Sequence, residues 1–152
     1  MSAKSEPRRP GAVLFMCRMN SIRSPMAEAI ARHYMPSVYI ASAGVRRGER
    51  DPFVDAVLDE VGLALQKHQP RLLEDLEDDY FDLIITLAPE AHHAALDMTR
   101  ALAADVVYWP TPDPTVATGS REQILDAYRE VRDHLTKLIV TRLAGGAEPA
   151  GV

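Results

Sequence analysis

One short segment of this chain carries residues that could do chemistry together. Residues 17–24 read Cys-Arg-Met-Asn-Ser-Ile-Arg-Ser, and Cys17 is the only cysteine in the chain. A cysteine attacks as its thiolate, which is stabilised at the N-terminus of a helix and beside an arginine. Arg23 follows at a short spacing, and its guanidinium can bind two oxygens of a tetrahedral anion at once. The pattern therefore predicts a phosphate-binding loop with a nucleophile at its base.

The residues on either side place this loop between a strand and a helix. An apolar run at residues 12–16 predicts a buried strand, and a helix is expected at about 23–34 with Pro25 in its first turn. The N–H groups that begin this helix should converge on a bound oxyanion. Ser24 is expected either to cap the helix or to donate its hydroxyl to the thiolate. A lone cysteine is more often a small buried apolar residue, but a cysteine placed only for packing does not require Arg23 after it.

Strands and helices alternate along the rest of the chain. Further strands are expected at residues 38–41, 81–87 and 106–109, and helices at 52–61, 90–103 and 121–143, with one helical turn at 72–76. This alternation predicts an α/β sandwich around a parallel sheet, in which ligands bind at the carboxyl ends of the strands. The Cys17 loop, residues 42–47, the turn after Leu87 and the loop around Asp113 should therefore meet at one edge.

The composition narrows the class of protein. With 152 residues, 47% hydrophobic and 26% charged, the chain fits one globular domain with a single core. Its net charge of −5 argues against general nucleic-acid binding, and its apolar runs are too short to span a membrane. Residues 1–11 lack the apolar core of a signal peptide. One cysteine forms no intrachain disulfide and fits a reducing compartment, so the cytoplasm is the expected location.

A set of motifs along the chain carries a family resemblance. The motifs are Val13-Leu14-Phe15-Met16-Cys17, Asn20, Arg23-Ser24-Pro25-Met26-Ala27-Glu28, Ser42-Ala43-Gly44, Phe81-Asp82-Leu83-Ile84-Ile85-Thr86-Leu87, Trp109 and Asp113-Pro114. In these motifs the chain resembles the low-molecular-weight protein tyrosine phosphatases, whose fold and loop the thioredoxin-coupled arsenate reductases share. The resemblance covers about residues 12–143. It implies a three-layer sandwich with a four-stranded parallel sheet in the order 2-1-3-4 and the phosphate-binding loop after strand 1.

The resemblance also implies roles for single residues. Cys17 is expected to be the nucleophile, Arg23 to bind the phosphoryl oxygens and Asp113 to be the general acid. An Asp-Pro pair by itself more often marks only a turn. The expected substrate-binding residues are Arg18, Met19, Asn20, Ser21, Ile22, Ser24 and Ser42, of which Asn20 and Ser42 match family positions that brace the loop. Arg18, Arg46 and Arg47 are candidates for the rim of the site. No metal and no other cofactor is expected.

Three departures from the family pattern concern the phosphate-binding loop and the walls of the site. Met19 stands where the family usually has glycine, and a positive φ there would strain it. Ile22 replaces a second cysteine that many members carry before the arginine. Residues 115–117 read Thr-Val-Ala, where phosphotyrosine-specific members have aromatic residues. Aromatic walls select a phenyl phosphate, so the missing aromatic residues bear on phosphotyrosine selectivity.

Three functions remain open at this point. The first is a phosphomonoester hydrolase, a protein tyrosine phosphatase, that forms a cysteinyl phosphate. The second is an arsenate reductase that uses an external thiol, because the chain lacks the two further cysteines of the thioredoxin-coupled route. The third is a non-catalytic module that binds phosphate or another anion.

The resemblance and the composition also set the expected partners and organisation. The expected partners are a phosphorylated protein or a small phosphate ester, with phosphate, vanadate or arsenate as anion ligands. Nucleic acid and membrane are not expected partners, and the protein is expected to be a monomer or a weak dimer. We expect a flexible leader at residues 1–10, one phosphatase-like domain at 11–144 and a flexible tail at 145–152.

Overall fold

The computed structural model describes residues 10–65, 68–76, 80–98 and 104–145. The strands are β1 (Ala12–Cys17), β2 (Tyr39–Gly44), β3 (Leu83–Thr86) and β4 (Asp105–Tyr108). The α-helices are α1 (Arg23–Tyr34), α2 (Pro52–Asp59), α3 (Pro89–Met98) and α4 (Arg121–Arg142), and the 3₁₀ turns are η2 (Leu73–Asp75) and η3 (Pro114–Val116). Each element expected from the sequence is present, with ends that differ by a few residues.

The largest differences concern β2 and the ends of the chain. The expected strand at 38–41 instead begins at Tyr39 and continues to Gly44, because Ser42 pairs with Phe15 of β1 and Gly44 pairs with Cys17. The last part of the helix expected at 90–103 lies outside the described residues from position 99 onward. Apart from Pro10 and Gly145, the expected leader and tail also lie outside them.

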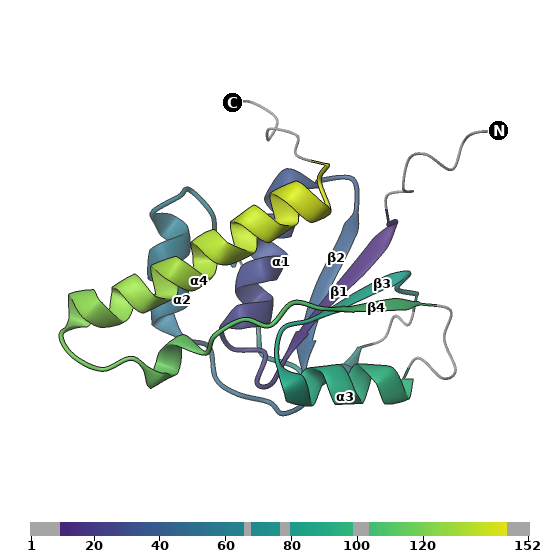
Figure 1. Cartoon of the computed structure of the whole chain (residues 1–152), viewed down its shortest axis with the longest axis horizontal. Helices are drawn as coiled ribbons and strands as arrows, with labels where there is room; N and C mark the ends of the chain where they lie inside the picture. The colour runs from purple at the N-terminus through teal and green to yellow at the C-terminus, as the bar shows by residue number, and fades with distance from the viewer. Residues whose placement is uncertain (1–9, 66–67, 77–79, 99–103, 146–152) are drawn as a thin grey trace.

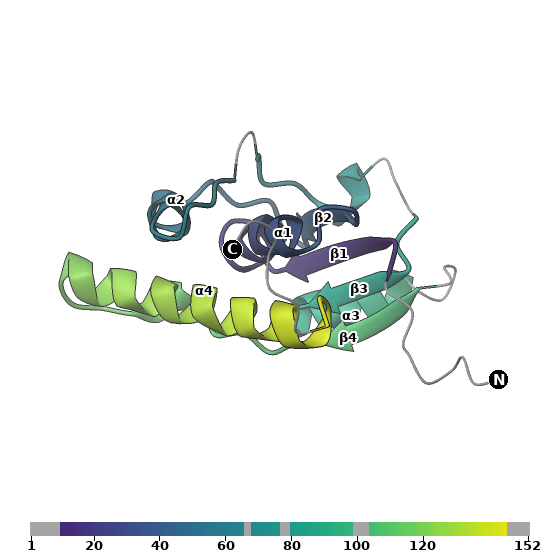
Figure 2. The same cartoon turned by 90° about the horizontal axis from the view of Figure 1, so that it is seen from above.

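The sheet has the predicted architecture. All strands are parallel, and their order is β2-β1-β3-β4. Figure 1 shows α3 on one face of the sheet and α1 and α4 on the other, with α2 beside α4. Seen from above in Figure 2, the strands lie side by side in this order, and α3 lies behind them. The α/β sandwich and the strand order are therefore confirmed. Among the described residues, no helix combines the length and the apolar character needed to cross a bilayer.

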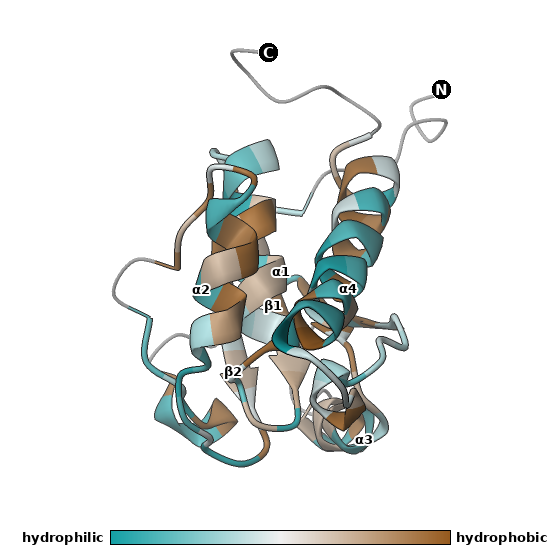
Figure 3. Ribbon diagram, turned by 90° about the vertical axis from the view of Figure 1, so that its left-hand side faces the viewer, coloured by the Kyte–Doolittle hydropathy of each residue, from teal (hydrophilic) through white to brown (hydrophobic). Residues whose placement is uncertain are grey.

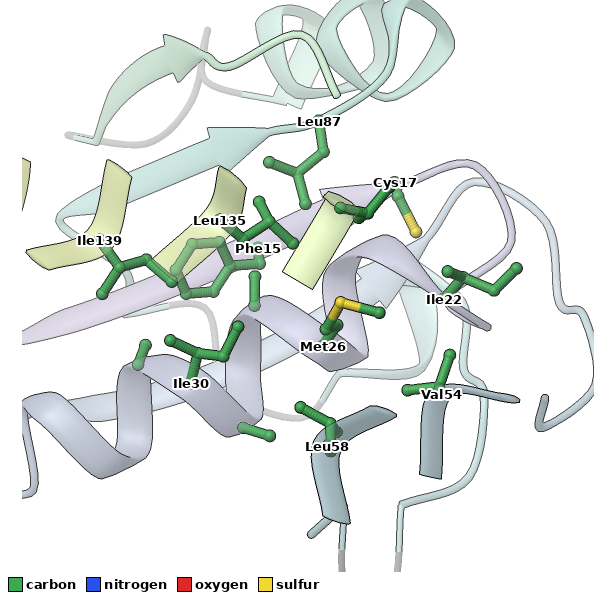
Figure 4. Close-up of a cluster of buried hydrophobic side chains, with 14 of the residues drawn as sticks. Phe15, Cys17, Ile22, Met26, Ile30, Val54, Leu58, Leu87, Leu135 and Ile139 are labelled. Carbon is green, nitrogen blue, oxygen red and sulfur yellow. The ribbon is translucent and has the colours of Figure 1, made fainter. Parts of the chain in front are cut away.

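The alternation of side chains along β1 decides where the cysteine points. Val13, Phe15 and Cys17 belong to the core between the sheet and helices α1, α2 and α4, whereas Leu14 and Met16 belong to the core beneath α3. Successive side chains of a strand face opposite sides of the sheet. Cys17 is two residues after Phe15 and therefore faces the same side, toward α1. Figure 4 shows it at the end of β1, above Met26 of that helix.

Helix α4 covers this side of the sheet, and its N-terminus follows the loop that contains Asp113. Ser120 caps the helix, since its hydroxyl accepts from the N–H of Gln123 while the Gln123 side chain accepts from the N–H of Ser120. This reciprocal pair is a capping box. In Figure 3, hydrophilic and hydrophobic stretches alternate along α4, as expected of an amphipathic helix. The helix thereby begins at a defined residue, shortly after the Asp113 loop.

Candidate active site

The three residues expected to be catalytic line one hollow of about 490 Å³ at the carboxyl ends of the strands. Its described lining consists of Cys17, Arg18, Met19, Ser21, Ile22, Arg23, Arg47, Gly48, Glu49, Asp51, Asp113 and Thr115. The residues come from the loop after β1, the loop before α2 and the loop before α4. Segments distant in the sequence therefore meet here, as the topology of a parallel sheet predicts.

Cys17 lies in contact with two polar groups of Ser24. Its side chain is almost fully buried, and its sulfur lies 3.4 Å from the backbone nitrogen of Ser24 and 3.0 Å from the Ser24 hydroxyl oxygen. Ile22 occupies the N-cap of α1 and makes no side-chain capping bond. Of the two roles considered for Ser24, the structure therefore shows the contact with sulfur. Within the first turn of α1, the Ser24 N–H is directed at the sulfur, and the Met26 N–H donates to the carbonyl of Ile22 at 3.0 Å.

Asn20 and Ser42 lie beneath the loop rather than in the lining of the hollow. The Asn20 amide donates to the hydroxyls of Ser24, at 2.8 Å, and Ser42, at 3.0 Å. The side-chain oxygen Oδ1 of Asn20 accepts from the backbone N–H of Arg71 at 2.9 Å. All three of these polar side chains are fully buried, so each bond removes the cost of burying an unpaired polar group. Together they hold the loop in one shape.

Two further residues, which the sequence alone did not connect to the site, continue this network. Ser42 donates to buried Glu28 at 2.5 Å, and Glu28 also pairs with Arg32 at 2.6 Å. The sequence indicates no partner for His68. In the structure its ring donates from Nε2 to the backbone carbonyl oxygen of Asn20 at 3.3 Å. Burial lowers the pKa of His68 below its usual value. Glu28 belongs to the matched motif, but only the fold reveals its contact with Ser42.

Met19 fits the loop without backbone strain. Among the described residues other than glycine, only Asn20 has a positive φ, at 55°, and asparagine tolerates this conformation better than most residues. The strain considered for Met19 is therefore not present. The loop before α2 runs directly over this segment, with the N–H of Gly48 donating to the Met19 carbonyl at 3.0 Å and that of Arg46 to the Arg18 carbonyl at 2.8 Å.

Replacing Gly44 with alanine should distort the phosphate-binding loop. A Cβ at this position would lie 2.8 Å from the backbone nitrogen of Asn20 and 2.8 Å from the carbonyl carbon of Met19. Because backbone atoms cannot move aside as a flexible side chain can, we expect a loss of about 1–3 kcal/mol in the free energy of unfolding. We also expect weaker phosphate binding. Urea unfolding and calorimetric titration with phosphate measure the two effects.

The matched control for this substitution is Gly11→Ala. A Cβ at Gly11 would approach only a side-chain oxygen of Asp82, at an ordinary distance of 3.7 Å. The control should change neither stability nor phosphate affinity beyond the spread of ordinary surface substitutions, about ±0.5 kcal/mol. Equal behaviour of the two alanine variants would contradict the close packing inferred at Gly44.

Asp113 forms a turn and faces the hollow at the same time. It is the N-cap of η3, and its Oδ1 accepts from the backbone N–H of Thr115 at 2.9 Å and from the Thr115 hydroxyl at 2.6 Å. Partial burial acts to raise the pKa of Asp113, but these hydrogen bonds and the positive charges of Arg23 and Arg18 outweigh it and lower the pKa below its usual value. The Asp-Pro turn and a role in chemistry are thus compatible.

The rim of the hollow combines paired arginines with an absence of aromatic side chains. Arg18 and Arg46 both pair with Glu90, at 3.1 and 3.4 Å, and Arg47 pairs with Asp75. Arg18 and Arg47 line the hollow, whereas Arg46 is not part of its lining. Within the described part of the chain, none of the lining residues is aromatic. A substrate would therefore meet charged, hydroxyl and aliphatic side chains, such as those of Met19 and Ile22, but no flat aromatic wall.

Known proteins share this sequence pattern and this arrangement. The family described as "Low molecular weight phosphotyrosine protein phosphatase" matches residues 12–144. An arsenate reductase of Halalkalibacterium halodurans is 28% identical over 85% of this chain and 92% of its own. The low molecular weight protein-tyrosine-phosphatase Wzb of Salmonella typhi is 30% identical over 80% of this chain and 79% of its own.

The fold has a counterpart among solved structures. An arsenate reductase in its phosphate-binding state superposes with a TM-score of 0.74 at 23% identity, covering 90% of this chain and 98% of that protein. The match of fold agrees with the match of sequence, which extends over nearly the whole described region. The chain belongs to the low molecular weight phosphotyrosine protein phosphatase family.

Proposed function

We propose that this protein hydrolyses phosphate monoesters, phosphotyrosine in proteins among them, through a cysteinyl-phosphate intermediate. The observation that carries the proposal is the meeting of Cys17, Arg23 and Asp113 in one hollow, at the open N-terminus of α1. A nucleophile, an anion clamp and a proton donor are the three groups this reaction needs. Membership of the phosphatase family supports it.

In the first step of the proposed reaction, the Cys17 thiolate attacks phosphorus. The new S–P bond forms as the bond from phosphorus to the ester oxygen breaks, and protonated Asp113 gives its proton to the leaving oxygen. The N–H groups of the loop and the fork of Arg23 bind the three remaining phosphoryl oxygens. The products of this step are the free alcohol or phenol and a phosphorylated Cys17.

In the second step, water releases the phosphate. Asp113, now ionised, takes a proton from the water as its oxygen attacks phosphorus, and the S–P bond breaks to restore the thiolate. Ser24 is placed to assist here, because its hydroxyl lies within 3.0 Å of the sulfur and can donate to the thiolate as it leaves. Proton and charge therefore return to their starting positions after one turnover.

The proposal extends to partners and setting. We assign the phosphatase domain to residues 11–144 and expect the protein to act as a monomer or weak dimer in the cytoplasm. Phosphate, vanadate and arsenate should bind in the Cys17 loop, where Arg18, Met19, Ser21 and Ile22 line the hollow. Neither step of the proposed reaction uses a cofactor.

Replacing Arg23 with lysine should slow turnover at least about tenfold. Lysine keeps the positive charge but not the planar fork that binds two oxygens at once. In the structure the fork is already oriented, since Nη1 donates to the carbonyl of Thr111 at 3.0 Å. Steady-state kinetics with an aryl phosphate gives the change in kcat. Arg142→Lys, a change of the same type in the last turn of α4, is the control, and equal rates for both variants would argue against the clamp.

A panel of substrates tests the function as a whole. Phosphotyrosine and phosphoserine peptides and small phosphate esters should be compared by phosphate release, with arsenate reduction assayed separately. We expect hydrolysis of aryl phosphates, with modest preference for phosphotyrosine over small esters because the hollow has no aromatic wall. Absence of phosphate release from every ester would overturn the proposal.

Reduction of arsenate is the second candidate, supported by the relatives of that name. Arsenate would condense with the Cys17 thiol with loss of water. An external thiol would then attack the sulfur and release arsenite, leaving a mixed disulfide that a second external thiol reduces. Two thiols thus supply the two electrons that arsenic gains, which is required because the chain has one cysteine. Arsenite production that depends on added thiol would support this route.

A further inference from the structure

The residue two positions after the expected acid is in direct contact with it. Thr115 lies in η3, is exposed to solvent and lines the same hollow as Cys17. Its hydroxyl donates to Oδ1 of Asp113 at 2.6 Å, and its backbone N–H donates to the same oxygen at 2.9 Å. The backbone bond comes with the turn whatever residue follows. The hydroxyl bond, by contrast, requires threonine or serine at this position.

The two bonds make the oxygens of Asp113 inequivalent. An oxygen that accepts from two donors is the poorer site for a proton, so a protonated Asp113 carries its hydrogen on Oδ2. Both bonds also favour the ionised carboxyl group over the protonated one. The hydroxyl of Thr115 therefore acts on two properties of an acid, namely which atom delivers the proton and how readily that proton is released.

We infer that Thr115 is a positioning residue for proton transfer, whose hydroxyl holds Oδ1 of Asp113 so that Oδ2 delivers the proton to the leaving group. The inference rests on the proposed hydrolysis for its catalytic meaning, though the contact itself does not depend on it. The balance of the first step is unchanged, since the proton passes from Oδ2 to the ester oxygen as the P–O bond breaks. Thr115 gains and loses nothing in the reaction.

Other charged groups surround Asp113 and must be held constant in any test. Arg23 and Arg18 act on it from the loop after β1, and Tyr128 acts from α4. Further titratable groups beside its loop include Arg47, Glu49 and Asp51 across the hollow, and Glu130 and His134 on the adjoining face of α4. A substitution at Thr115 alters none of these charges, so its effect on the titration of Asp113 can be attributed to the lost hydroxyl.

Thr115→Val removes the hydroxyl at nearly constant shape and should change the pH dependence of hydrolysis. With one donor fewer, the pKa of Asp113 rises, so the basic limb of kcat for an alkyl or unsubstituted phenyl phosphate moves to higher pH. Above the limb the variant should be faster by about threefold to tenfold, in line with one hydrogen bond to a partly exposed charge. Below the limb it should be slower, because its acid is weaker and less firmly oriented. The two profiles therefore cross.

Matched variants separate this effect from a general disturbance of the loop. Thr115→Ser keeps a hydroxyl and should keep the parent profile, and Val116→Ala, at the exposed neighbour, should do the same. In an Asp113→Asn background, Thr115→Val should leave the profile unchanged. A profile of Thr115→Val that coincides with the parent, or an equal shift in Thr115→Ser, would overturn the inference.

A measurement without turnover distinguishes failure of this inference from failure of the proposed function. The carboxyl carbon of Asp113 can be titrated by NMR in the substrate-free protein. Its midpoint should lie at higher pH in Thr115→Val than in the parent or in Thr115→Ser. This result would sustain the contact even if the protein hydrolysed no ester. An unchanged midpoint would refute the role of Thr115 even in an active phosphatase.

Discussion

Replacing Cys17 with serine is expected to abolish turnover while leaving phosphate binding nearly unchanged. The serine hydroxyl is a far weaker nucleophile than a thiolate, and the site offers Ser24 rather than a base to activate it. Loss of the attacking group in a covalent mechanism typically costs several orders of magnitude, here on the order of 10⁴-fold or more in kcat. Binding persists because the N–H groups of the loop and Arg23 remain in place.

Two measurements on the same preparation test this expectation. Steady-state hydrolysis of an activated aryl phosphate gives kcat, and calorimetric titration with inorganic phosphate gives the affinity. Thermal unfolding of the variant serves as the control for folding, because Cys17 also packs in the core beside Met26. Activity of the folded serine variant close to that of the parent would exclude a cysteinyl-phosphate intermediate. Equal loss of turnover and of phosphate affinity would point instead to a damaged loop.

Replacing Asp113 with asparagine should slow hydrolysis by about 10²–10⁴-fold, but only for esters with poor leaving groups. An alkoxide or unsubstituted phenoxide needs a proton as it departs, whereas a phenoxide with strong electron-withdrawing substituents scarcely does. Asparagine keeps the shape and can still accept from Thr115. The slope of log kcat against leaving-group pKa should therefore become steeper in the variant.

The pH dependence supplies the second signature of this variant. In the parent, the rate on poor leaving groups falls as pH rises through the pKa of Asp113 in the substrate complex, because the acid loses its proton. In the free protein, the hydrogen bonds from Thr115 and the charges of Arg23 and Arg18 outweigh partial burial and hold the pKa of Asp113 below its usual value. These contacts place the limb at lower pH than for an isolated carboxylic acid. The negative charge of the bound phosphate acts in the opposite direction and raises the pKa in the complex. The limb should flatten when Asp113 is replaced.

The matched control for Asp113→Asn is a carboxylate of α4. Glu130→Gln removes a carboxylate from α4 beside the same loop, outside the hollow that holds Cys17, and should leave the leaving-group slope unchanged. If Asp113→Asn lowered good and poor leaving groups equally, Asp113 would be structural. The acid would then have to be another carboxylate near the site, such as Asp51, which accepts from the Phe53 N–H and the Tyr128 hydroxyl, or Glu90, which pairs with Arg18.

The sequence by itself was enough to predict the local part of this site. Cys17 and Arg23 lie in one continuous strand–loop–helix segment, and short-range patterns determine such a segment directly: an apolar run, a proline in the first turn and a helical period. The parallel sheet followed from alternating strands and helices, and the strand order 2-1-3-4 followed from the family resemblance. Both are confirmed.

Interactions between segments far apart in the sequence were beyond such patterns. Arg132 occupies a buried position on α4 because its guanidinium reaches the carbonyl of Val57 and the carboxylate of Glu60, both at 2.8 Å. No periodicity in α4 alone could indicate these partners. Likewise, the sequence could not show whether the loop needs a positive φ at Met19. The positive φ falls instead on Asn20, whose amide is held by Ser24, Ser42 and Arg71.

The tertiary structure also decided what each polar residue does. The sequence analysis left Asn20 and Ser42 with two expected roles, binding of substrate and bracing of the loop, and Ser24 with more than one. Asn20 and Ser42 are buried and hydrogen-bonded to each other beneath the loop, and Ser24 lies against the sulfur. Asp113 and Thr115 were neighbours in the sequence from the start, yet only the turn directs both donors of Thr115 to one oxygen. The sequence determined which reactive groups the chain possesses. Packing, which depends on contacts between distant segments, determined their distances and their partners.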